Sequence, residues 1–232
     1  MKSQPRALFI LDGFTIVIMA VAIFMVFGYA PVEQVMGLVQ KVFYFHVASA
    51  WVGMLAFMAA AVAAIAYLTK RNPIWDLVGL GAIEIGLAFC LITIISGSIW
   101  ARPIWNTWWT WDPRLTTATI MELVYAAYLM LRAGIEDPER RARFGAVYAI
   151  IGFISVPLTF FSIRIYRTIH PIVIGGADPN ATGAFAMTPA MGLTFGISLV
   201  AFTFFFASLL WHRIRLGQLA ARVEQFRMRL SH

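Results

Sequence analysis

Two histidines and a cluster of tryptophans are the residues whose types and spacing best suit ligand binding. His46 lies in the apolar stretch FYFHVASAW, and His170 lies in a stretch rich in glycine and proline, directly before Pro171. Residues 100–111 contain five of the eight tryptophans of the chain. A polar side chain in an apolar stretch costs free energy unless it has a partner, so function is the default interpretation of His46. Imidazoles are common metal ligands, and indole rings pack well against flat apolar molecules.

Haem is the ligand that best combines these features. Two neutral imidazoles that face each other suit the two axial positions of a haem iron. A structural zinc site takes four ligands, and the single cysteine, Cys90, lies inside an apolar run. The sequence therefore predicts a site for haem b with His46 and His170 as iron ligands. Four tryptophans are expected to shield the porphyrin from water: Trp105, Trp108, Trp109 and Trp111.

The arginines near these residues suit the two propionates of haem, because a guanidinium binds a carboxylate in bidentate geometry. Four arginines lie in the same two segments of the sequence: Arg102, Arg114, Arg164 and Arg167. Asp112 is expected to close the tryptophan segment onto the helix that follows, by holding Arg114 or an indole N–H. It also suits the capping position of that helix, and the two roles are compatible.

Each of these residues also has a structural interpretation. A single histidine in a membrane helix is more often a packing residue, and tryptophans often anchor helix ends at the membrane surface. We keep the anchoring interpretation for Trp51, Trp75 and Trp211. Haem binding is favoured for the others because the histidines, indoles and guanidiniums converge on one side of the predicted fold.

The elements that must position these residues are membrane-spanning helices. The 232 residues are 61% hydrophobic and 12% charged, with a mean hydropathy of +0.79, which excludes a soluble globular domain. Six apolar runs approach the roughly 20 residues that a helix needs to cross a bilayer. We therefore expect an all-α bundle in one membrane domain, residues 1–212, with the tryptophans in a loop at 100–115. The predicted spans are residues 7–30, 42–69, 76–99, 116–132, 144–163 and 190–212.

The distribution of positive charge predicts the orientation of this bundle. Of the 18 lysines and arginines, thirteen fall on the side of both termini and five on the other side. The positive-inside rule then places both termini in the cytoplasm and the tryptophan loop and His170 outside. The net charge of +7 reflects this topology, so we expect no nucleic-acid partner.

Two further segments are amphipathic. Residues 31–41 carry Val32, Val35, Met36 and Val39 at helical spacing, which predicts a short helix on the membrane surface. Residues 213–232 form a basic tail that either rests on the anionic cytoplasmic leaflet or docks to a partner subunit. The sequence has no Walker A motif, so we expect no ATP hydrolysis by this chain alone.

The segment WNTWWTWDPRLT at residues 105–116 resembles the tryptophan-rich WWD signature of haem-handling membrane proteins. With His46 before it and His170 after it, the whole chain is similar to the haem exporter protein C (CcmC) family of cytochrome c maturation. The family pattern has glycine where this chain has Asn106. The resemblance implies a non-enzymatic protein of the bacterial inner membrane that holds haem at the periplasmic face. The residues it implies for this site are His46, His170, Trp108, Trp109, Trp111 and Asp112.

The resemblance also implies partners. Haem would pass to a periplasmic haem chaperone (CcmE-like) before its delivery to apocytochrome c. The chain would work in an ABC-type complex with an ATP-binding subunit (CcmA-like), a second membrane subunit (CcmB-like) and a small single-helix protein (CcmD-like).

Three other functions are compatible with parts of the sequence. A b-type electron-transfer subunit also uses two histidines, but it usually buries both in facing helices, whereas His170 lies in a loop. A haem lyase forms the thioether bonds itself, and the larger WWD proteins of that kind carry additional helices and histidines. A solute permease without haem is the remaining alternative.

Overall fold

The structure is a computed structural model that describes residues 4–171 and 187–230. Its elements in these residues are helical, and α1 continues into a π-helical turn, Met25–Tyr29, while a short 3-10 turn, Leu38–Lys41, leads into α2. The α-helices are α1 (Arg6–Phe24), α2 (Val42–Lys70), α3 (Pro73–Trp105), α4 (Pro113–Ala133), α5 (Pro138–Gly152), α6 (Ser155–Ile165) and α7 (Pro189–Leu230).

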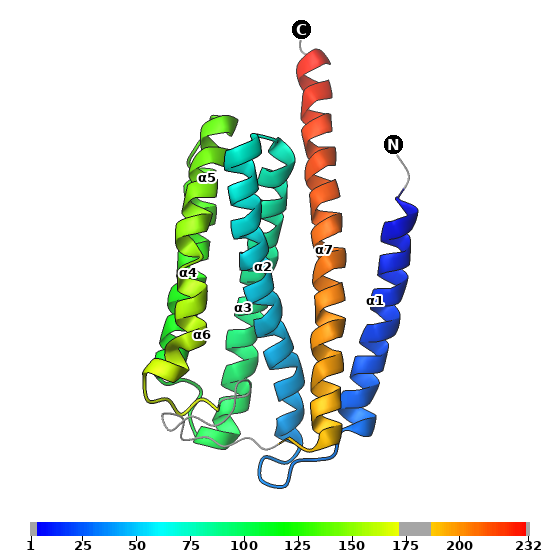
Figure 1. Cartoon of the computed structure of the whole chain (residues 1–232), viewed down its shortest axis with the longest axis vertical. Coiled ribbons are helices and arrows are strands. Elements are labelled where there is room, and N and C mark those ends of the chain that lie inside the picture. The colour runs from blue at the N-terminus through cyan, green and yellow to red at the C-terminus, as the bar shows by residue number, and fades with distance from the viewer. Residues whose placement is uncertain (1–3, 172–186, 231–232) are drawn as a thin grey trace.

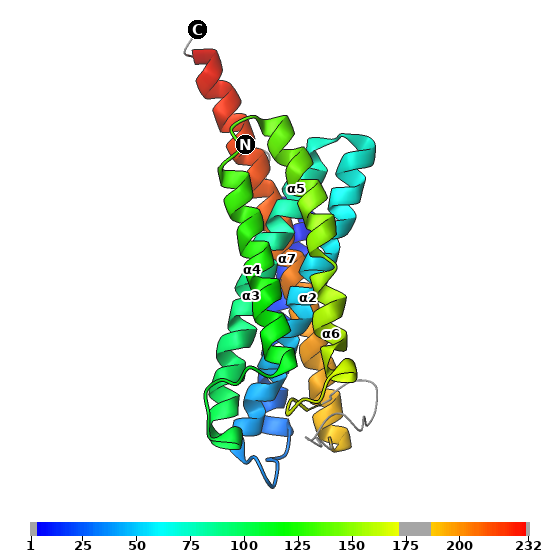
Figure 2. The same cartoon turned by 90° about the vertical axis from the view of Figure 1, so that its left-hand side faces the viewer.

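The helices run along a common axis and form one bundle (Figure 1). α2 and α3 pack against each other at its centre, with α4, α5 and α6 on one side and α7 followed by α1 on the other. The start of α1 and the end of α7 lie at the same end of the bundle. The segments that follow α1, α3 and α6 lie at the opposite end, and α7 extends beyond the bundle (Figure 2).

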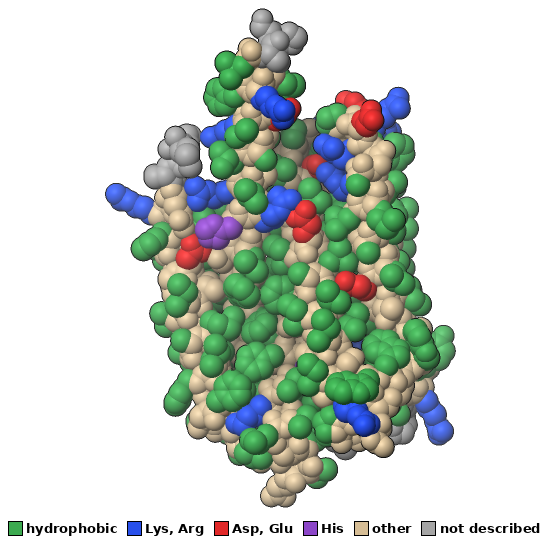
Figure 3. All heavy atoms as spheres, turned by 180° about the vertical axis from the view of Figure 1, so that it is seen from behind, with side chains coloured by type: hydrophobic (Ala, Val, Ile, Leu, Met, Phe, Trp, Pro, Cys, Tyr) green, Lys and Arg blue, Asp and Glu red, His purple; other side chains and the backbone are tan. Residues whose placement is uncertain are grey.

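The bundle has the surface of a multi-pass membrane protein. Charged side chains gather mainly towards its two ends, and the surface between them is largely hydrophobic (Figure 3). Five helical segments of the described chain are long and apolar enough to span a membrane: Arg6–Tyr29, Leu38–Lys70, Pro73–Trp105, Pro138–Ile165 and Pro189–Leu230. α4 is not among these five segments; it has 21 residues, about the length of a membrane crossing, and packs against α5 and α6.

Three helices begin with the same local sequence, a capping residue followed by proline. The side chains of Asn72, Asp112 and Asp137 accept hydrogen bonds from backbone N–H groups in the first turns of α3, α4 and α5. The following proline has no N–H of its own to satisfy and already has a helical φ. These pairs fix where α3, α4 and α5 start, and hence where α4 leaves the tryptophan segment.

Several element boundaries differ from the predicted ones. The predicted span 144–163 is two helices, α5 and α6, because Pro157 has no N–H to donate to the carbonyl one turn earlier. α3 continues to Trp105, so the segment between α3 and α4 is residues 106–112 instead of 100–115. α7 continues to Leu230, so the described part of the predicted tail 213–232 extends the last helix.

The helix predicted within residues 31–41 is wrong for residues 31–37. The Glu33 carboxylate accepts hydrogen bonds from two backbone N–H groups, that of Val35 at 2.8 Å and that of Met36. These hydrogen bonds stabilise a turn. Gly37 then has a φ of +61°, a conformation that ends a helix. Lys41, which closes the segment, donates from Nζ to the carbonyls of Val26 and Ala30 and caps the end of the first span.

Two ion pairs join helices near the end of the bundle that holds the termini. Arg213 of α7 binds Glu84 of α3 with both Nε and Nη2, the latter at 2.9 Å. Arg132 of α4 binds Asp76 of α3 in bidentate fashion, at 2.6 and 2.9 Å. No local pattern in the sequence pairs Glu84 with Arg213, because the two residues are 129 positions apart.

Candidate functional site

A pocket lies at the end of the bundle opposite the chain termini. Residues of α2, α3, α4, α6 and α7 line it, together with Trp108, Trp109 and residues 170–171, and its empty space of about 1160 Å³ includes open solvent. Its lining is largely apolar and aromatic, with both predicted histidines among the few polar side chains.

His46 enters the pocket from the first turns of α2. Its Nδ1 lies 3.1 Å from the carbonyl oxygen of Thr93 and 3.2 Å from Ser96 Oγ, both on α3. Because a carbonyl can only accept, Nδ1 carries the proton, and the lone pair of the neutral ring lies on Nε2. Gly97 makes room for the ring, since a Cβ at this position would lie 2.9 Å from His46 Cε1.

His170 enters from the segment after α6 and has the same tautomer. Its Nδ1 lies 3.0 Å from the carbonyl oxygen of Pro171, which leaves the Nε2 lone pair free for a ligand. Burial, with a smaller contribution from Arg114 and His46, lowers the pKa of His170 to about 3. The imidazole is therefore neutral at physiological pH, as metal ligation requires.

The two imidazoles are spaced as axial ligands of one metal ion would be. Their ring centroids are 6.4 Å apart, with an angle of 37° between the ring planes. A metal–nitrogen bond of about 2 Å plus roughly 1 Å from that nitrogen to the ring centre places two opposed imidazoles about 6 Å apart. The centroid distance of this pair matches that expected for two imidazoles on one metal ion, and the surrounding lining is apolar and aromatic.

Asp112 holds the segment that carries His170. One carboxylate oxygen accepts hydrogen bonds from Arg114 N, at 2.9 Å, and from Thr168 Oγ1, at 2.7 Å. The other accepts from Ile169 N at 2.9 Å. Thr168 Oγ1 in turn accepts from His170 N at 3.0 Å. The predicted capping role of Asp112 is present, and its second contact is with this segment, where an indole N–H or the Arg114 side chain had been expected.

The tryptophans divide between the pocket and the surface. Trp105, Trp108 and Trp109 line the pocket, and Trp105 lies edge-on to His170 with the ring centroids 6.5 Å apart. Trp111 does not line it: its side chain is 76% exposed and contacts Trp109 edge-on. Asn106 ends α3 with φ +54° and ψ +23°, a left-handed conformation that glycine favours and asparagine tolerates.

The arginines divide in the same way. Arg114 and Arg164 line the pocket, and Arg114 Nη1 donates to the carbonyls of Thr159 and Phe160 at 2.8 and 2.9 Å. Arg102 instead binds Asn106 at the end of α3, and Arg167 is exposed, and neither lines the pocket. The structure thus brings two of the four guanidiniums to the predicted ligand.

Sequence reasoning missed several residues of the site. Trp51, expected to anchor the membrane surface, lines the pocket and donates from Nε1 to Thr203 Oγ1 of α7 at 2.9 Å. Trp100 lines it from α3, edge-on to Trp105. Gly97 carried no signal in the sequence, because its role depends on which face of α3 meets α2. Trp51 follows His46 by five residues, about 140° around the helix axis, so helical spacing did not link the two residues either.

Known proteins resemble this chain along most of its length. The sequence model of the family described as "CcmC: Heme exporter protein C" matches residues 1–229. A "Heme exporter protein C" of Bradyrhizobium diazoefficiens is 30% identical over 214 residues, which cover 92% of this chain and 80% of that protein. The protein of the same name in Escherichia coli K12 is 29% identical, over 67% of this chain and 64% of its own. A "Putative cytochrome c biosynthesis ccmC-like mitochondrial protein" of Marchantia polymorpha is 29% identical, over 85% and 81%.

Proposed function

Because the chain belongs to the heme exporter protein C (CcmC) family of cytochrome c maturation, we propose that it binds haem b as cargo between His46 and His170 and delivers it to a haem chaperone. The single observation that carries this proposal is the histidine pair. Both rings keep Nε2 free by binding a carbonyl through Nδ1, and their centroids are 6.4 Å apart in an aromatic pocket. In this proposal the protein binds and releases haem and makes no covalent bond to it.

The two histidines are held with different rigidity, which suits delivery. His46 is fixed on a membrane helix and buttressed by α3. His170 lies in a segment that is tied to Asp112 through Thr168 and Ile169. A segment held by a few hydrogen bonds opens at lower cost than a helix in the bundle. An acceptor imidazole can therefore replace His170 while His46 retains the iron.

The other residues of the pocket bind and shield the cargo. The indoles of Trp105 and Trp109 cover apolar surface and exclude water, and Arg114 and Arg164 supply positive charge for the propionates. When haem is bound, its iron would accept the Nε2 lone pairs of His46 and His170, which the contacts of Nδ1 keep available.

The proposed setting is the bacterial inner membrane, with six spans including α4, both termini in the cytoplasm and the pocket facing the periplasm. The thirteen positive charges on the side of the termini, against five on the other, support this orientation. We propose as partners a CcmE-like chaperone at the pocket and an ABC-type complex with CcmA-like, CcmB-like and CcmD-like subunits. The family membership and the absence of a Walker A motif from the sequence support an ATPase on another chain.

Absorption spectroscopy of the purified protein tests the haem site. Wild type loaded with haem should show the Soret band of six-coordinate, low-spin iron, and His46→Ala and His170→Ala should each shift or abolish it. His212→Ala is the matched control, since His212 lies at the other end of the bundle and binds Asp12. A wild-type spectrum that neither pocket variant alters would refute ligation by this pair.

Transfer separates delivery from the alternatives. Haem-loaded protein mixed with a purified haem chaperone of the CcmE kind should lose its Soret band as the chaperone gains one. Retention of the haem with reversible reduction and oxidation would indicate an electron-transfer subunit. A thioether-linked haem on added apocytochrome c, formed without the chaperone, would indicate a lyase.

A further inference from the structure

The last part of α7 is a helix without a neighbour in the described structure. Beyond Gly217, which packs against Leu77 of α3, every residue up to Leu230 is exposed, and the helix projects past the other helices (Figures 1 and 2). Five large apolar side chains form a row here and are between 43% and 88% exposed: Leu216, Leu219, Val223, Phe226 and Leu230. Met228 lies outside this row. Such a row on a helix outside the bundle needs a surface to cover it.

The spacing of this row is that of a coiled-coil seam. The five residues follow one another at intervals of three, four, three and four, which is the heptad repeat with apolar residues at positions a and d. We call these five residues the α7 seam. Its 15 residues span about 22 Å at 1.5 Å per residue.

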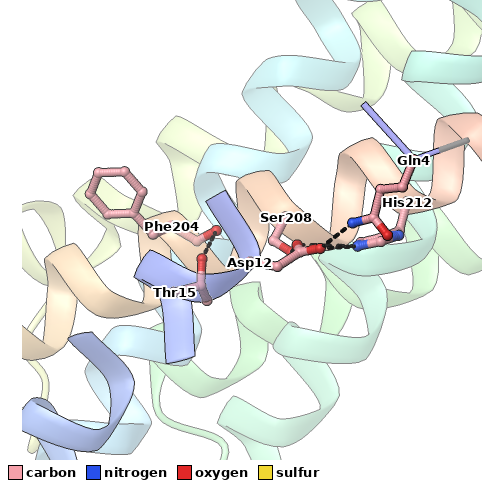
Figure 4. Close-up of polar contacts among 6 residues, drawn as sticks. All are labelled: Gln4, Asp12, Thr15, Phe204, Ser208 and His212. Atoms are coloured by element: carbon pink, nitrogen blue, oxygen red, sulfur yellow. Dashed lines mark hydrogen bonds and ion pairs between the residues drawn. The ribbon is translucent and has the colours of Figure 1, made fainter. Parts of the chain in front are cut away.

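The face of α7 that carries the seam is already used for helix packing closer to the bundle. His212 lies on this face one turn before Leu216, and Ser208 lies two turns before it. Both contact Asp12 of α1, at 2.6 Å from Ser208 Oγ and 3.0 Å from His212 Nε2 (Figure 4). α1 begins at Arg6, so this face is covered up to His212 and uncovered from Leu216 onward. The α7 seam therefore continues an existing helix–helix contact.

The charges beside the seam identify the kind of helix that fits. Arg215, Arg222 and Arg229 recur every seven residues and occupy position g, directly beside the seam. Position e holds Ala220 and Arg227. A second copy of this helix would place Arg222 against Arg227 in a parallel pair, or arginines of position g against one another in an antiparallel pair. Self-association is disfavoured, and a helix with acidic residues at these positions is favoured.

We propose that residues 216–230 of α7 form one half of a helix pair with another protein, whose helix presents apolar residues at heptad spacing and Asp or Glu towards the arginines of position g. This partner helix stacks on the bundle beyond the start of α1. A membrane leaflet is the less suitable cover, because α7 continues along the bundle axis and its seam does not lie in the plane of the bilayer. The proposal goes beyond haem binding and does not depend on it.

Binding of designed peptides to the full-length protein tests this proposal. Two labelled three-heptad peptides carry Leu at a and d and differ only at e and g, which hold Glu in one and Lys in the other. The protein is held in phosphatidylcholine nanodiscs, and fluorescence anisotropy gives the affinities. We expect the Glu peptide to bind about tenfold or more tightly than the Lys peptide, because three charge pairs change sign.

Variants make the test specific. The charge reversal R215E/R222E/R229E should invert the preference between the peptides, and Leu219→Ser with Phe226→Ser should weaken binding of the preferred peptide. Ala221→Glu with Gln225→Glu changes the opposite face and should leave the preference unchanged. The Soret band of haem-loaded protein should be the same in all of these variants. A negative result for peptide binding is therefore distinguishable from a failure of the proposed haem site.

Three results would overturn the proposal. Equal affinity for the two peptides, or no binding of either, would show that the seam selects no acidic helix. A doubled mass in the nanodisc that Leu219→Ser abolishes would indicate self-pairing. Protection of residues 213–230 from trypsin in discs with anionic lipid, with no peptide binding, would indicate that the tail rests on the leaflet.

Discussion

Replacement of Asp112 by asparagine should weaken haem binding by displacing His170. Asparagine caps a helix as well as aspartate does, so the start of α4 is preserved when Asn Oδ1 faces Arg114 N. The amide nitrogen then takes the position of the oxygen that accepts from Ile169 N at 2.9 Å. A donor faces a donor, and the segment before His170 loses one charge-assisted hydrogen bond outright.

The magnitude follows from that bond. A hydrogen bond to a charged group contributes about 1.5–3 kcal/mol, and each 1.4 kcal/mol is about tenfold in an equilibrium constant. If the segment is displaced, the fraction of protein that is competent to bind falls, and the apparent dissociation constant rises by the same factor. We expect the dissociation constant for haem to rise roughly tenfold or more in Asp112→Asn.

The assay is titration of the purified apoprotein with haem, followed at the Soret band. Asp137→Asn is the matched control, because Asp137 also precedes a proline and caps α5 through the N–H of Arg140, at 2.7 Å, but lies at the other end of the bundle. Added imidazole should restore a six-coordinate spectrum in Asp112→Asn by replacing the displaced His170. Equal affinities for the Asp112→Asn and Asp137→Asn proteins would refute the positioning role of Asp112.

Two further predictions concern the neighbours of the site and the frame that supports it. Gly97→Ala should lower haem affinity and shift the Soret band, because the added Cβ would lie 2.9 Å from His46 Cε1. Gly196→Ala is the control, since its Cβ would meet open space, and it should leave the spectrum unchanged. Equal spectra for the two variants would contradict the packing of Gly97 against His46. Arg132→Ala leaves the Asp76 carboxylate without its bidentate partner and should cost about 3 kcal/mol, seen as a lower midpoint of thermal unfolding in detergent with an unaltered haem spectrum.

The sequence predicts those parts of the fold that hydropathy determines alone. Apolar runs located the helices, and the number of positive charges on each side predicted that the termini share one end, as they do here. At residues 31–37 the helical spacing of apolar residues predicted a helix, but the hydrogen bonds of the Glu33 carboxylate and the positive φ of Gly37 give a turn. The ion pair of Glu84 and Arg213 could not be predicted from the sequence, because it depends on which faces of α3 and α7 meet.

The site shows the same division between chemistry and placement. The residue type and the apolar sequence context predicted His46 and His170 as site residues, and the structure places their ring centroids 6.4 Å apart. Which arginines reach the pocket was beyond prediction, because Arg102 and Arg114 are equally close to the tryptophans in sequence and differ only in the helix end that each occupies.

The WWD signature therefore describes two structural roles instead of a single tryptophan platform. Trp108 and Trp109 line the pocket, while Trp111 lies outside it on the surface. Asp112 lines no part of the pocket, yet its carboxylate joins the start of α4 to the segment that carries His170. An aromatic residue at position 112 would lose the hydrogen bonds to Thr168 and Ile169 that hold this segment. The acidic residue belongs in the signature because the second histidine lies in a segment that needs an anchor.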